Sequence, residues 1–493
     1  MRHFFLGLVV LAVVATTGRA EPIELESRRE LFVDRHLIDS LVGAELFLHQ
    51  PHDEGPVFQF DQPWEGQFSA YVTVLYDGEK YRMYYRGMPE IVPGSRVPER
   101  TCYAESEDGV HWTRPTLNKV EFDGSTANNL LMANAPGLTH NFSPFIDSNP
   151  DADPKQKFKA ICGIATTQLH GFVSPDGVNW TPIQEEPVFV DRKGGFDSQN
   201  VAFWSDSEQC YVCYYRRSHG GRRSMARTTS KDFLHWTEPV PMTYSNTESP
   251  TPRYQLYTNQ THAYFRAPHI YLSTAARFMP GRRVLTAEQA ESIGVHPKYA
   301  GDAADAVLMT SRGGDLYDCT FDCGWVRPGT ALGNWVSRTN YPALNIVPTG
   351  REEMSLYVNQ EYGQPTSCIH RYSMRLDGFA SVRSRKEPGV LVTKPITFTG
   401  TELSLNFATS AAGGIQVEIQ DVDGNSIEGY SLADSVETIG NAIDRRVSWK
   451  EKGSDVSSLV GKPVRLKFVL SDADLYALQF VDAKGEDRLA GDH

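Results

Sequence analysis

The stretch Ser106–Trp112, with the sequence SEDGVHW, predicts the fold because it recurs along the chain. Close copies are Ser174–Trp180 (SPDGVNW) and Ser230–Trp236 (SKDFLHW), and weaker copies are Ser311–Tyr317 and Arg375–Phe379. Asp-Gly supplies a tight turn, and the Ser and Asp side chains bond to nearby backbone amides. We expect the aromatic residue at the end of each copy to pack between neighbouring sheets.

A pair of strand-like runs precedes each copy of this turn phrase. In the first unit the runs are 68–76 and 80–85, joined by Asp77-Gly78, and they show the β-rich, partly alternating pattern of strands. Two strands, the turn phrase and a further strand make one four-stranded unit, and five such units predict a five-bladed β-propeller. The run 30–38 is a candidate for the strand that closes the ring. A β-sandwich with decorated hairpins is the alternative fold.

The chain after the last copy has a different pattern. From about Gly389 to Phe480 short strands alternate with turns and the phrase is absent, which predicts a C-terminal β-sandwich. We therefore expect an all-β protein with a propeller over residues 21–386, a sandwich over 387–481 and a polar tail over 482–493. One helix is expected from Thr286 to Ile293, where Thr286 and Gln289 can form a capping box.

The first twenty residues have the pattern of an export signal. Arg2 and His3 precede an apolar run that ends at Val14, and small residues stand just before Glu21. The run is too short to cross about 30 Å of hydrocarbon. We expect residues 1–20 to be removed and the mature protein to be secreted or periplasmic, without membrane contact.

The composition excludes several classes of function. The 493 residues include 48 Lys and Arg and 61 Asp and Glu, so the formal net charge is −13. An acidic chain without a basic cluster is a poor partner for nucleic acid. The 8 Trp, 22 Tyr and 24 Phe are too many aromatic residues for a disordered chain. We expect no required cofactor; a calcium ion in the channel and the oligomeric state stay open.

Polar residues at the starts of the innermost propeller strands are the candidates for chemistry, because these starts converge at one mouth of the channel. Asp61 and Glu65 flank Trp64, Asp197 follows a pair of glycines, and Glu353 stands at the start of a strand. A Trp face suits the apolar face of a sugar ring, and a neighbouring carboxylate can transfer protons. The catalytic candidates are therefore these four acids, with Trp64 as a substrate platform.

Six further residues are candidates for binding the substrate. They are the donors, amides and cations at the remaining strand starts: His140, Asn141, Gln199, Asn200, Arg266 and His269. Each candidate also has a structural interpretation. A lone histidine is often only hydrogen-bonded, Asp197 can cap a turn, and Arg266 can pair with a structural acid.

Converging acids and aromatic platforms suit the hydrolysis of glycosidic bonds. The reaction needs one protonated and one ionised carboxyl group, about 5–5.5 Å apart for retention and about 6.5–9.5 Å apart for inversion. Burial and mutual repulsion raise the pKa of one group and leave that of the other low. The sequence does not give the separation.

The chain resembles the five-bladed propeller glycoside hydrolases of families 43, 32 and 117 over about residues 30–385. The resemblance rests on the turn phrase, on acids at the inner-strand starts and on four motifs: Leu31–Asp34, Pro63–Glu65, Phe196–Asn200 and Arg266–His269. The C-terminal sandwich is placed as in family 32. The resemblance implies hydrolysis or transfer at glycosidic bonds by an exported bacterial protein that degrades polysaccharides. It also implies Asp61 or Glu65 as base or nucleophile, and Asp197 or Glu353 as acid or pKa modulator.

The chain departs from these families at several motifs. The Asn-Asp-Pro-Asn-Gly type phrase of family 32 is missing, as are its Arg-Asp-Pro and Glu-Cys phrases, and His140 stands where families 43 and 32 have an Asp. Family 117 enzymes can use a histidine as the acid, which keeps His140 and His269 as candidates.

The leading prediction is a secreted glycoside hydrolase acting on a plant or algal polysaccharide or its oligosaccharides. The alternative is a carbohydrate-binding propeller without catalysis. A lyase or sialidase-like enzyme is a third interpretation, although the Arg triad and nucleophilic Tyr of sialidases are not located by the sequence.

Overall fold

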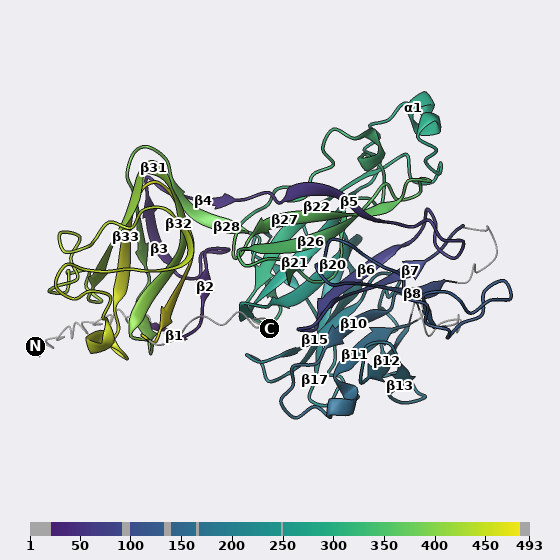
Figure 1. The fold of residues 1–493 in the computed structure, drawn as a ribbon, viewed down its shortest axis with the longest axis horizontal. Coiled ribbons are helices and arrows are strands. Elements are labelled where there is room, and N and C mark those ends of the chain that lie inside the picture. Colours follow the sequence, from purple (N-terminus) through teal and green to yellow (C-terminus); the bar gives the residue numbers. More distant parts are fainter. Residues whose placement is uncertain (1–20, 91–98, 133–139, 164–166, 248–249, 484–493) are drawn as a thin grey trace, which may run out of the picture.

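The structure is a computed structural model that describes residues 21–90, 99–132, 140–163, 167–247 and 250–483. The predicted export signal, residues 1–20, and most of the predicted tail lie outside the described residues. The chain forms two β regions that lie side by side along the long axis of the molecule (Figure 1). The larger region contains five blade sheets and one further two-stranded sheet, and the smaller one contains the C-terminal strands.

The larger region is a five-bladed β-propeller, as the sequence predicts, and each blade is an antiparallel sheet. Blade 1 consists of β6 (Ala70–Tyr76), β7 (Tyr81–Gly87), β8 (Arg100–Ser106) and β9 (Leu130–Met132). Blade 2 consists of β10 (Ser143–Ile146), β11 (Phe158–Cys162), β12 (Gln168–Ser174) and β13 (Thr181–Pro182), with β14 (Phe189–Val190) beside β12. Blade 3 consists of β15 (Val201–Ser205), β16 (Cys210–His219), β17 (Arg222–Ser230) and β18 (Val240–Pro241).

The last two blades have additional short strands. Blade 4 consists of β20 (Gln255–Tyr264), β21 (Ala267–Met279) and β22 (Ala303–Ser311), and the pair β19 (Thr243–Tyr244) and β23 (Leu316–Tyr317) lies next to it in the chain. Blade 5 consists of β24 (Tyr341–Pro342), β25 (Val347–Pro348), β26 (Glu353–Gln360), β27 (Cys368–Arg375) and β5 (His52–Gln59).

The strand that closes the ring is β5, which pairs with β27. The prediction that residues 30–38 close it is wrong, because β2 (Glu30–Leu31) pairs instead with β33 (Arg465–Val481) of the smaller region. An N-terminal strand next to the last blade of the chain joins the two ends of the propeller. Because the blades then form a ring, few sheet edges are exposed.

The turn phrases have the predicted local structure. In the second copy, the Asp176 carboxylate accepts hydrogen bonds from the backbone amides of Val178 and Asn179, at 2.9 and 2.7 Å. Trp180, which ends this copy, packs 4.9 Å from Phe142 of its own blade and 6.2 Å from Tyr84 of blade 1 (distances between ring centroids). The aromatic residue therefore fills the space between two blades, as expected.

The smaller region contains strands from both ends of the chain. Its strands are β1 (Ile23–Glu26), β2, β3 (Ile38–Val42), β4 (Glu45–Leu48), β28 (Ala380–Ser384), β29 (Gly389–Thr393), β30 (Ile396–Phe398), β31 (Glu402–Gln420), β32 (Asn441–Arg446) and β33. Residues 23–48 pair with the C-terminal strands, so the propeller expected from residue 21 begins only at β5. The prediction that residues 23–48 belong to the propeller is wrong, because the order of strands in the sequence does not show which distant strand completes a sheet.

The two longest strands, β31 and β33, hold the smaller region together. They pair over Glu402–Thr409 and again over Gly414–Gln420 of β31, with shifts in register between Asn406 and Phe407 and between Thr409 and Gly414. Side chains from both halves of β31, including Leu405 and Val417, are buried in one core with Trp449. The two halves therefore share one core, and the sandwich stays a prediction.

The predicted helix is α1 (Ala287–Ser292), and Thr286 caps it through the capping box with Gln289. Its segment packs against residues of blades 1 and 5: Ala290 and Tyr299 share a buried cluster with Phe68 and Tyr362. Three short 3-10 turns complete the secondary structure of the described residues: η1 (Pro154–Gln156), η2 (Leu332–Asn334) and η3 (Ser457–Leu459).

Candidate active site

The innermost strands of the five blades, β6, β10, β15, β20 and β24, begin around one end of the central channel, which we call the mouth. A chain of contacts links these starts. The Asn141 amide donates to the Ser198 carbonyl at 2.8 Å, Ser198 donates to the Tyr257 carbonyl at 3.1 Å, and the rings of Tyr257 and Tyr341 lie 5.6 Å apart. The mouth therefore joins residues of blades 2, 3, 4 and 5.

Side chains from several blades close the channel below the mouth. The Gln199 amide donates to the Thr73 hydroxyl at 2.9 Å, and the Gln260 amide donates to Gln199 at 2.6 Å and to the Pro342 carbonyl at 3.3 Å. Gln199 is 1% exposed. This predicted substrate ligand is therefore held inside the channel by other side chains.

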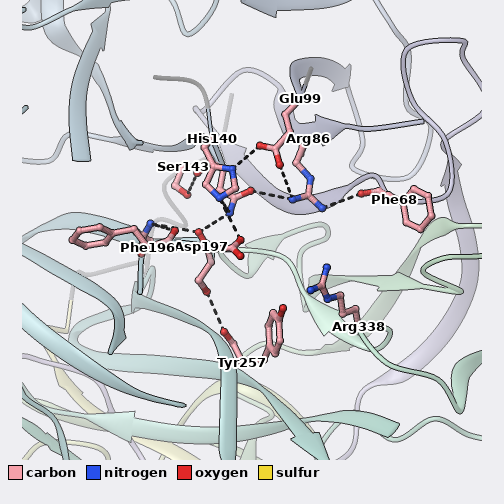
Figure 2. A network of polar contacts seen from close by, with 12 residues as sticks. Phe68, Arg86, Glu99, His140, Ser143, Phe196, Asp197, Tyr257 and Arg338 are labelled. Atoms are coloured by element: carbon pink, nitrogen blue, oxygen red, sulfur yellow. Dashed lines mark hydrogen bonds and ion pairs between the residues drawn. The ribbon is translucent and has the colours of Figure 1, made fainter. Parts of the chain in front are cut away.

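His140 is the centre of the polar network at the mouth (Figure 2). Its Nδ1 lies 2.6 Å from Glu99 Oε2, just before β8, and its Nε2 lies 3.4 Å from Asp197 Oδ1, just before β15. The side chain of Asp197 is 54% exposed, whereas that of His140 is 15% exposed. One imidazole thus connects a partly buried acid, Glu99, to a more accessible one, Asp197.

The charges in this network support one another. Burial alone would lower the pKa of His140, but its hydrogen bonds to Asp197 and Glu99 outweigh burial and raise this pKa to about 9. The hydrogen bond from His140 holds the pKa of Asp197 well below its usual value. Burial raises the pKa of Glu99, but nearby Arg86 and His140 outweigh this effect and lower it. At neutral pH the arrangement is one imidazolium between two carboxylates.

Asn141 and Asn200 hold the loops of this network in place. Asn141 has a φ of 50° and is 1% exposed, and its side chain accepts from Arg86 Nη1 at 3.5 Å. Asn200 is also 1% exposed and donates to the Phe196 carbonyl at 3.1 Å. Both predicted substrate ligands lie next to Asp197 and its loop, where their contacts are with protein.

Arginines and tyrosines form the opposite wall of the mouth. The Arg86 guanidinium lies 4.5 Å from the ring centroid of Tyr71 and pairs with Glu99 at 3.3 Å. The Arg338 guanidinium lies 5.3 Å from the ring centroid of Tyr257. In Figure 2, Arg86 and Arg338 lie on the same side of Asp197.

The loop with Asp61, Trp64 and Glu65 lies apart from this network. Glu65 is 0% exposed and accepts from the Tyr85 hydroxyl and from Arg114 Nε and Nη2, at 2.9 and 2.8 Å for the two arginine atoms. A carboxylate enclosed in this way cannot touch a substrate, so its predicted catalytic role is replaced by a structural one.

The two neighbours of Glu65 have different environments. Asp61 is 61% exposed and lies 3.2 Å from Arg114. The Trp64 indole donates to Asn129 at 2.8 Å, and its ring packs 5.5 Å from that of Phe122. The Trp64 ring is therefore used in packing within blade 1, and neither residue contacts the His140 network.

Glu353 lies at the other end of its blade from the mouth. β26 begins at Glu353, opposite Arg375, and its far end at Asn359 pairs with Tyr341 of the mouth. Glu353 forms an ion pair with Arg371 at 2.8 Å and lines a hollow of about 500 Å³ at the junction of the two β regions. The structure therefore does not bring Glu353 together with Asp197.

Arg266 and His269 also lie away from the mouth, because β20 begins at Gln255 and these residues follow its far end. Arg266 lies 3.5 Å from buried Asp377, and His269 lies 2.8 Å from buried Glu30. Both predicted substrate ligands therefore join the propeller to the smaller region. The prediction that Arg266 and His269 lie at the mouth is wrong, because a run of polar residues does not show which end of a strand it flanks.

Sequence reasoning missed six residues of the mouth: Tyr71, Arg86, Glu99, Arg216, Tyr257 and Arg338. Tyr71 and Arg338 have φ values of 57° and 62°, a backbone state that is uncommon for such residues and invisible in a single sequence. A shift in register between Ala70 and Thr73 accompanies the Tyr71 conformation, and such bulges redirect side chains. A polar residue just before a strand is the available signal, and Glu99 precedes β8, a strand for which the sequence analysis predicts no run.

Within the ranges that the structure describes, no group of three His, Cys, Asp or Glu side chains is arranged to hold a metal ion. The channel calcium therefore stays a prediction without assigned ligands. Among the same residues, no helix is long and apolar enough to cross a bilayer.

The fold and the mouth define a five-bladed β-propeller protein with an accessory β region. No family model and no curated protein matches the sequence. Similar solved structures include an N-acetylgalactosamine deacetylase from F. plautii in complex with blood group B trisaccharide (12% identity, 68% of this chain and 96% of that chain, TM-score 0.43).

Two further similar structures are described as enzymes that act on glycans. One represents the GH130 family of mannoside phosphorylases, which contains glycoside hydrolases that target β-1,2 mannosidic linkages in Candida mannan (15% identity, 67% and 94% covered, TM-score 0.40). The other is a fructofuranosidase from Schwanniomyces occidentalis complexed with fructosylnystose (10% identity, 88% and 98% covered, TM-score 0.38). Since each TM-score lies below 0.5, the similarity alone assigns no activity to this chain.

Proposed function

We propose that this protein is an exported glycoside hydrolase that cleaves glycosidic bonds of a plant or algal polysaccharide, or of its oligosaccharides, at the propeller mouth. One observation carries the proposal: Asp197 is half exposed and ionised, and it lies beside His140, which is protonated at neutral pH. An ionised carboxylate and a proton donor are the kinds of group that glycosidic hydrolysis needs. Their 3.4 Å contact is shorter than the separation of a retaining or an inverting carboxyl pair, so the proposal rests on a histidine–carboxylate pair and not on two carboxyl groups.

The residues of the mouth have separate roles in this proposal. Asp197 supplies the negative charge that an oxocarbenium-like transition state requires. As the bond from the anomeric carbon to the leaving oxygen breaks, that oxygen takes a proton from His140, and a water oxygen bonds to the carbon. The proton released by the water returns to His140 through Asp197, across their 3.4 Å contact. Glu99 is a positioning residue that orients His140 from Nδ1.

Two tyrosines of the mouth belong to other blades than Asp197, Tyr71 to blade 1 and Tyr257 to blade 4. They are 7% and 5% exposed, and the guanidinium groups of Arg86 and Arg338 lie over their rings. Their ring faces are therefore not free to stack on a sugar, and their phenolic hydroxyls are the groups that can donate to its oxygens. The platform role predicted for Trp64 is not taken over by these two tyrosines.

A second candidate function is carbohydrate binding without turnover. It is favoured by the position of Glu65 and Glu353, which leaves Asp197 as the one strongly exposed carboxylate of the described mouth network. The two candidates differ in whether bonds are broken.

A glycan panel tests the proposal. Purified protein should release reducing sugar from at least one plant or algal polysaccharide or oligosaccharide, and heat-inactivated protein should release none. Saturable binding in calorimetry with no release over several days would favour the binding protein instead. N-terminal sequencing of the mature chain from the periplasm or medium tests export, and a start at Glu21 is expected.

A further inference from the structure

The mouth is more cationic than the rest of the molecule. The chain carries a net charge of −13. Within the part of the mouth that the structure describes, however, Arg86, Arg216, Arg338 and protonated His140 face two carboxylates, Asp197 and Glu99. The guanidinium carbons of Arg216 and Arg338 lie 5.2 and 5.3 Å from the ring centroid of Tyr257. The hydrolytic chemistry proposed for Asp197 and His140 does not use these two arginines.

Of the three arginines at the mouth, Arg86 pairs with an acid, whereas Arg216 and Arg338 do not pair with any described acid. Arg86 pairs with Glu99 at 3.3 Å. Arg338 Nη1 contacts only the hydroxyls of Tyr299 and Tyr362, both at 3.4 Å, and no described acid lies within 4.0 Å of its guanidinium. These long hydrogen bonds to neutral groups leave the charge of Arg338 without a counter-charge.

Arg216 likewise forms no ion pair with a described acid. Its Nη1 is buried, and no hydrogen-bond partner for it is found among the described residues. The charge of Arg216 contributes to the low pKa of Asp197, so Arg216 is close to the exposed acid without forming an ion pair with it. A buried donor without a partner destabilises a fold unless a ligand or water satisfies it.

The backbone holds Arg338 in an uncommon state. Its φ of 62° lies in the left-handed region, which costs free energy for a residue with a long side chain. The rings of Tyr257, Tyr299 and Tyr362 surround its guanidinium at 5.3, 5.1 and 5.8 Å. This enclosure directs a fixed positive charge at the mouth.

We propose that the mouth binds a glycan that carries an oxyanion, either the carboxylate of a uronic acid or a sulfate ester, and that Arg338 and Arg216 hold this group beside Asp197. The proposal rests on the proposed function and adds the substrate class. Guanidinium groups match carboxylate and sulfate in charge and in the geometry of their donors. A neutral glycan would leave both charges without a partner.

Matched pairs of probes test the proposal by calorimetry. Trigalacturonate is compared with its carboxyl-reduced form, a sulfated carrageenan oligosaccharide is compared with its desulfated form, and inorganic phosphate is measured alone. In at least one pair we expect the acidic member to bind at least tenfold more tightly than the neutral one. The pair of probes in which the acidic member binds more tightly shows whether the oxyanion is a carboxylate or a sulfate. Binding of the acidic probe should weaken as the salt concentration is raised.

Variants locate the binding. Arg338→Gln and Arg216→Gln should each remove most of the preference for the acidic probe, while Arg338→Lys should retain part of it. Arg351→Gln is the matched control, because this substitution removes the same charge from an exposed residue. Arg351 stands two residues before Glu353, at the far end of blade 5 from the mouth. Unchanged thermal unfolding of each variant shows that it is folded.

The failure of this inference differs from failure of the hydrolase proposal. Equal binding within both pairs, no binding of either acidic probe, or phosphate alone binding as tightly as the acidic glycan would overturn the inference. Hydrolysis of neutral glycans without preference would overturn it and leave the hydrolase intact. Preferential binding of an acidic glycan without cleavage would support it and remove the hydrolase.

Discussion

His140 Nε2 lies 3.4 Å from Asp197 Oδ1, across the boundary between blades 2 and 3. The other ring nitrogen contacts Glu99 of blade 1, so one side chain joins three blades at the mouth. The charge of the accessible carboxylate therefore acts together with the protonation state of His140. We expect both activity and stability to depend on whether His140 is protonated.

Asp197→Asn should lower the rate of glycan cleavage by about 10³-fold or more, because the amide cannot supply negative charge at the transition state. The measurement is the initial rate of reducing-sugar release on the best substrate of the panel. Asp151→Asn, at an exposed turn, is the matched control and should retain the wild-type rate. A fully active Asp197→Asn would remove the catalytic role of this residue.

The rate should fall as pH rises through about 9, the pKa of His140 in the folded protein. Above that pH the imidazole is neutral and has no proton for the leaving oxygen. The groups that face it are Glu99, Asp197 and the more distant Arg86. In a pH–rate profile, a basic limb that stays in place in His140→Gln would contradict this assignment.

The same pKa predicts the pH dependence of stability. Because the pKa of His140 is raised above its ordinary value of 6.5, its stabilising contribution is full below about pH 6.5 and is lost as pH rises to about 9. Denaturant midpoints measured across this window should fall more for the wild type than for His140→Gln. Parallel curves for the two proteins would show that the histidine is not linked to folding.

Glu65→Gln should destabilise the fold by about 3 kcal/mol, because it removes a buried charge from its arginine and tyrosine partners. Asp61→Asn is an informative control, since Asp61 is 61% exposed and pairs with the same Arg114. Its loss should cost less than about 1 kcal/mol. Equal effects of both variants in chemical denaturation would disagree with the structural role of Glu65.

Asp377→Asn should weaken the junction between the two β regions. Asp377 is 0% exposed, lies 3.3 Å from Arg29, and accepts from Tyr264 and Asn406, both at 2.8 Å. Breaking such a buried pair costs about 3–5 kcal/mol, so the denaturation curve should shift or split into two transitions. Glu45→Gln, which removes an exposed pair with Arg385 at 3.9 Å, should leave the curve unchanged.

The propeller was predictable because its signal is local. The phrase ending in Trp180 contains both its turn, through Asp176, and the aromatic that packs between blades. Repetition at roughly even intervals then indicates radial architecture. The strand that closes the ring was not predictable, since β5 and β27 are separated by about three hundred residues and nothing in either marks the other.

The site was predictable only in part. Asp197 and His140 were singled out as polar residues before inner strands, and the structure brings these two together. Glu65 had the same local pattern, but its partner Arg114 lies 49 residues away in the sequence and encloses it. Local polarity does not show whether a side chain ends in solvent or against a distant partner.

The sequence by itself determined the β class, the five repeated units and the separate C-terminal pattern, because turns, alternation and aromatic positions depend on neighbouring residues. Only the tertiary structure decided which polar residues meet at the mouth. Glu99, His140 and Asp197 come from three blades. Arg266 and His269 lie at the end of the propeller opposite the mouth, because they follow the far end of β20. Charge pairing acts between atoms in space, and the spatial neighbours of a residue are set by the closure of the ring.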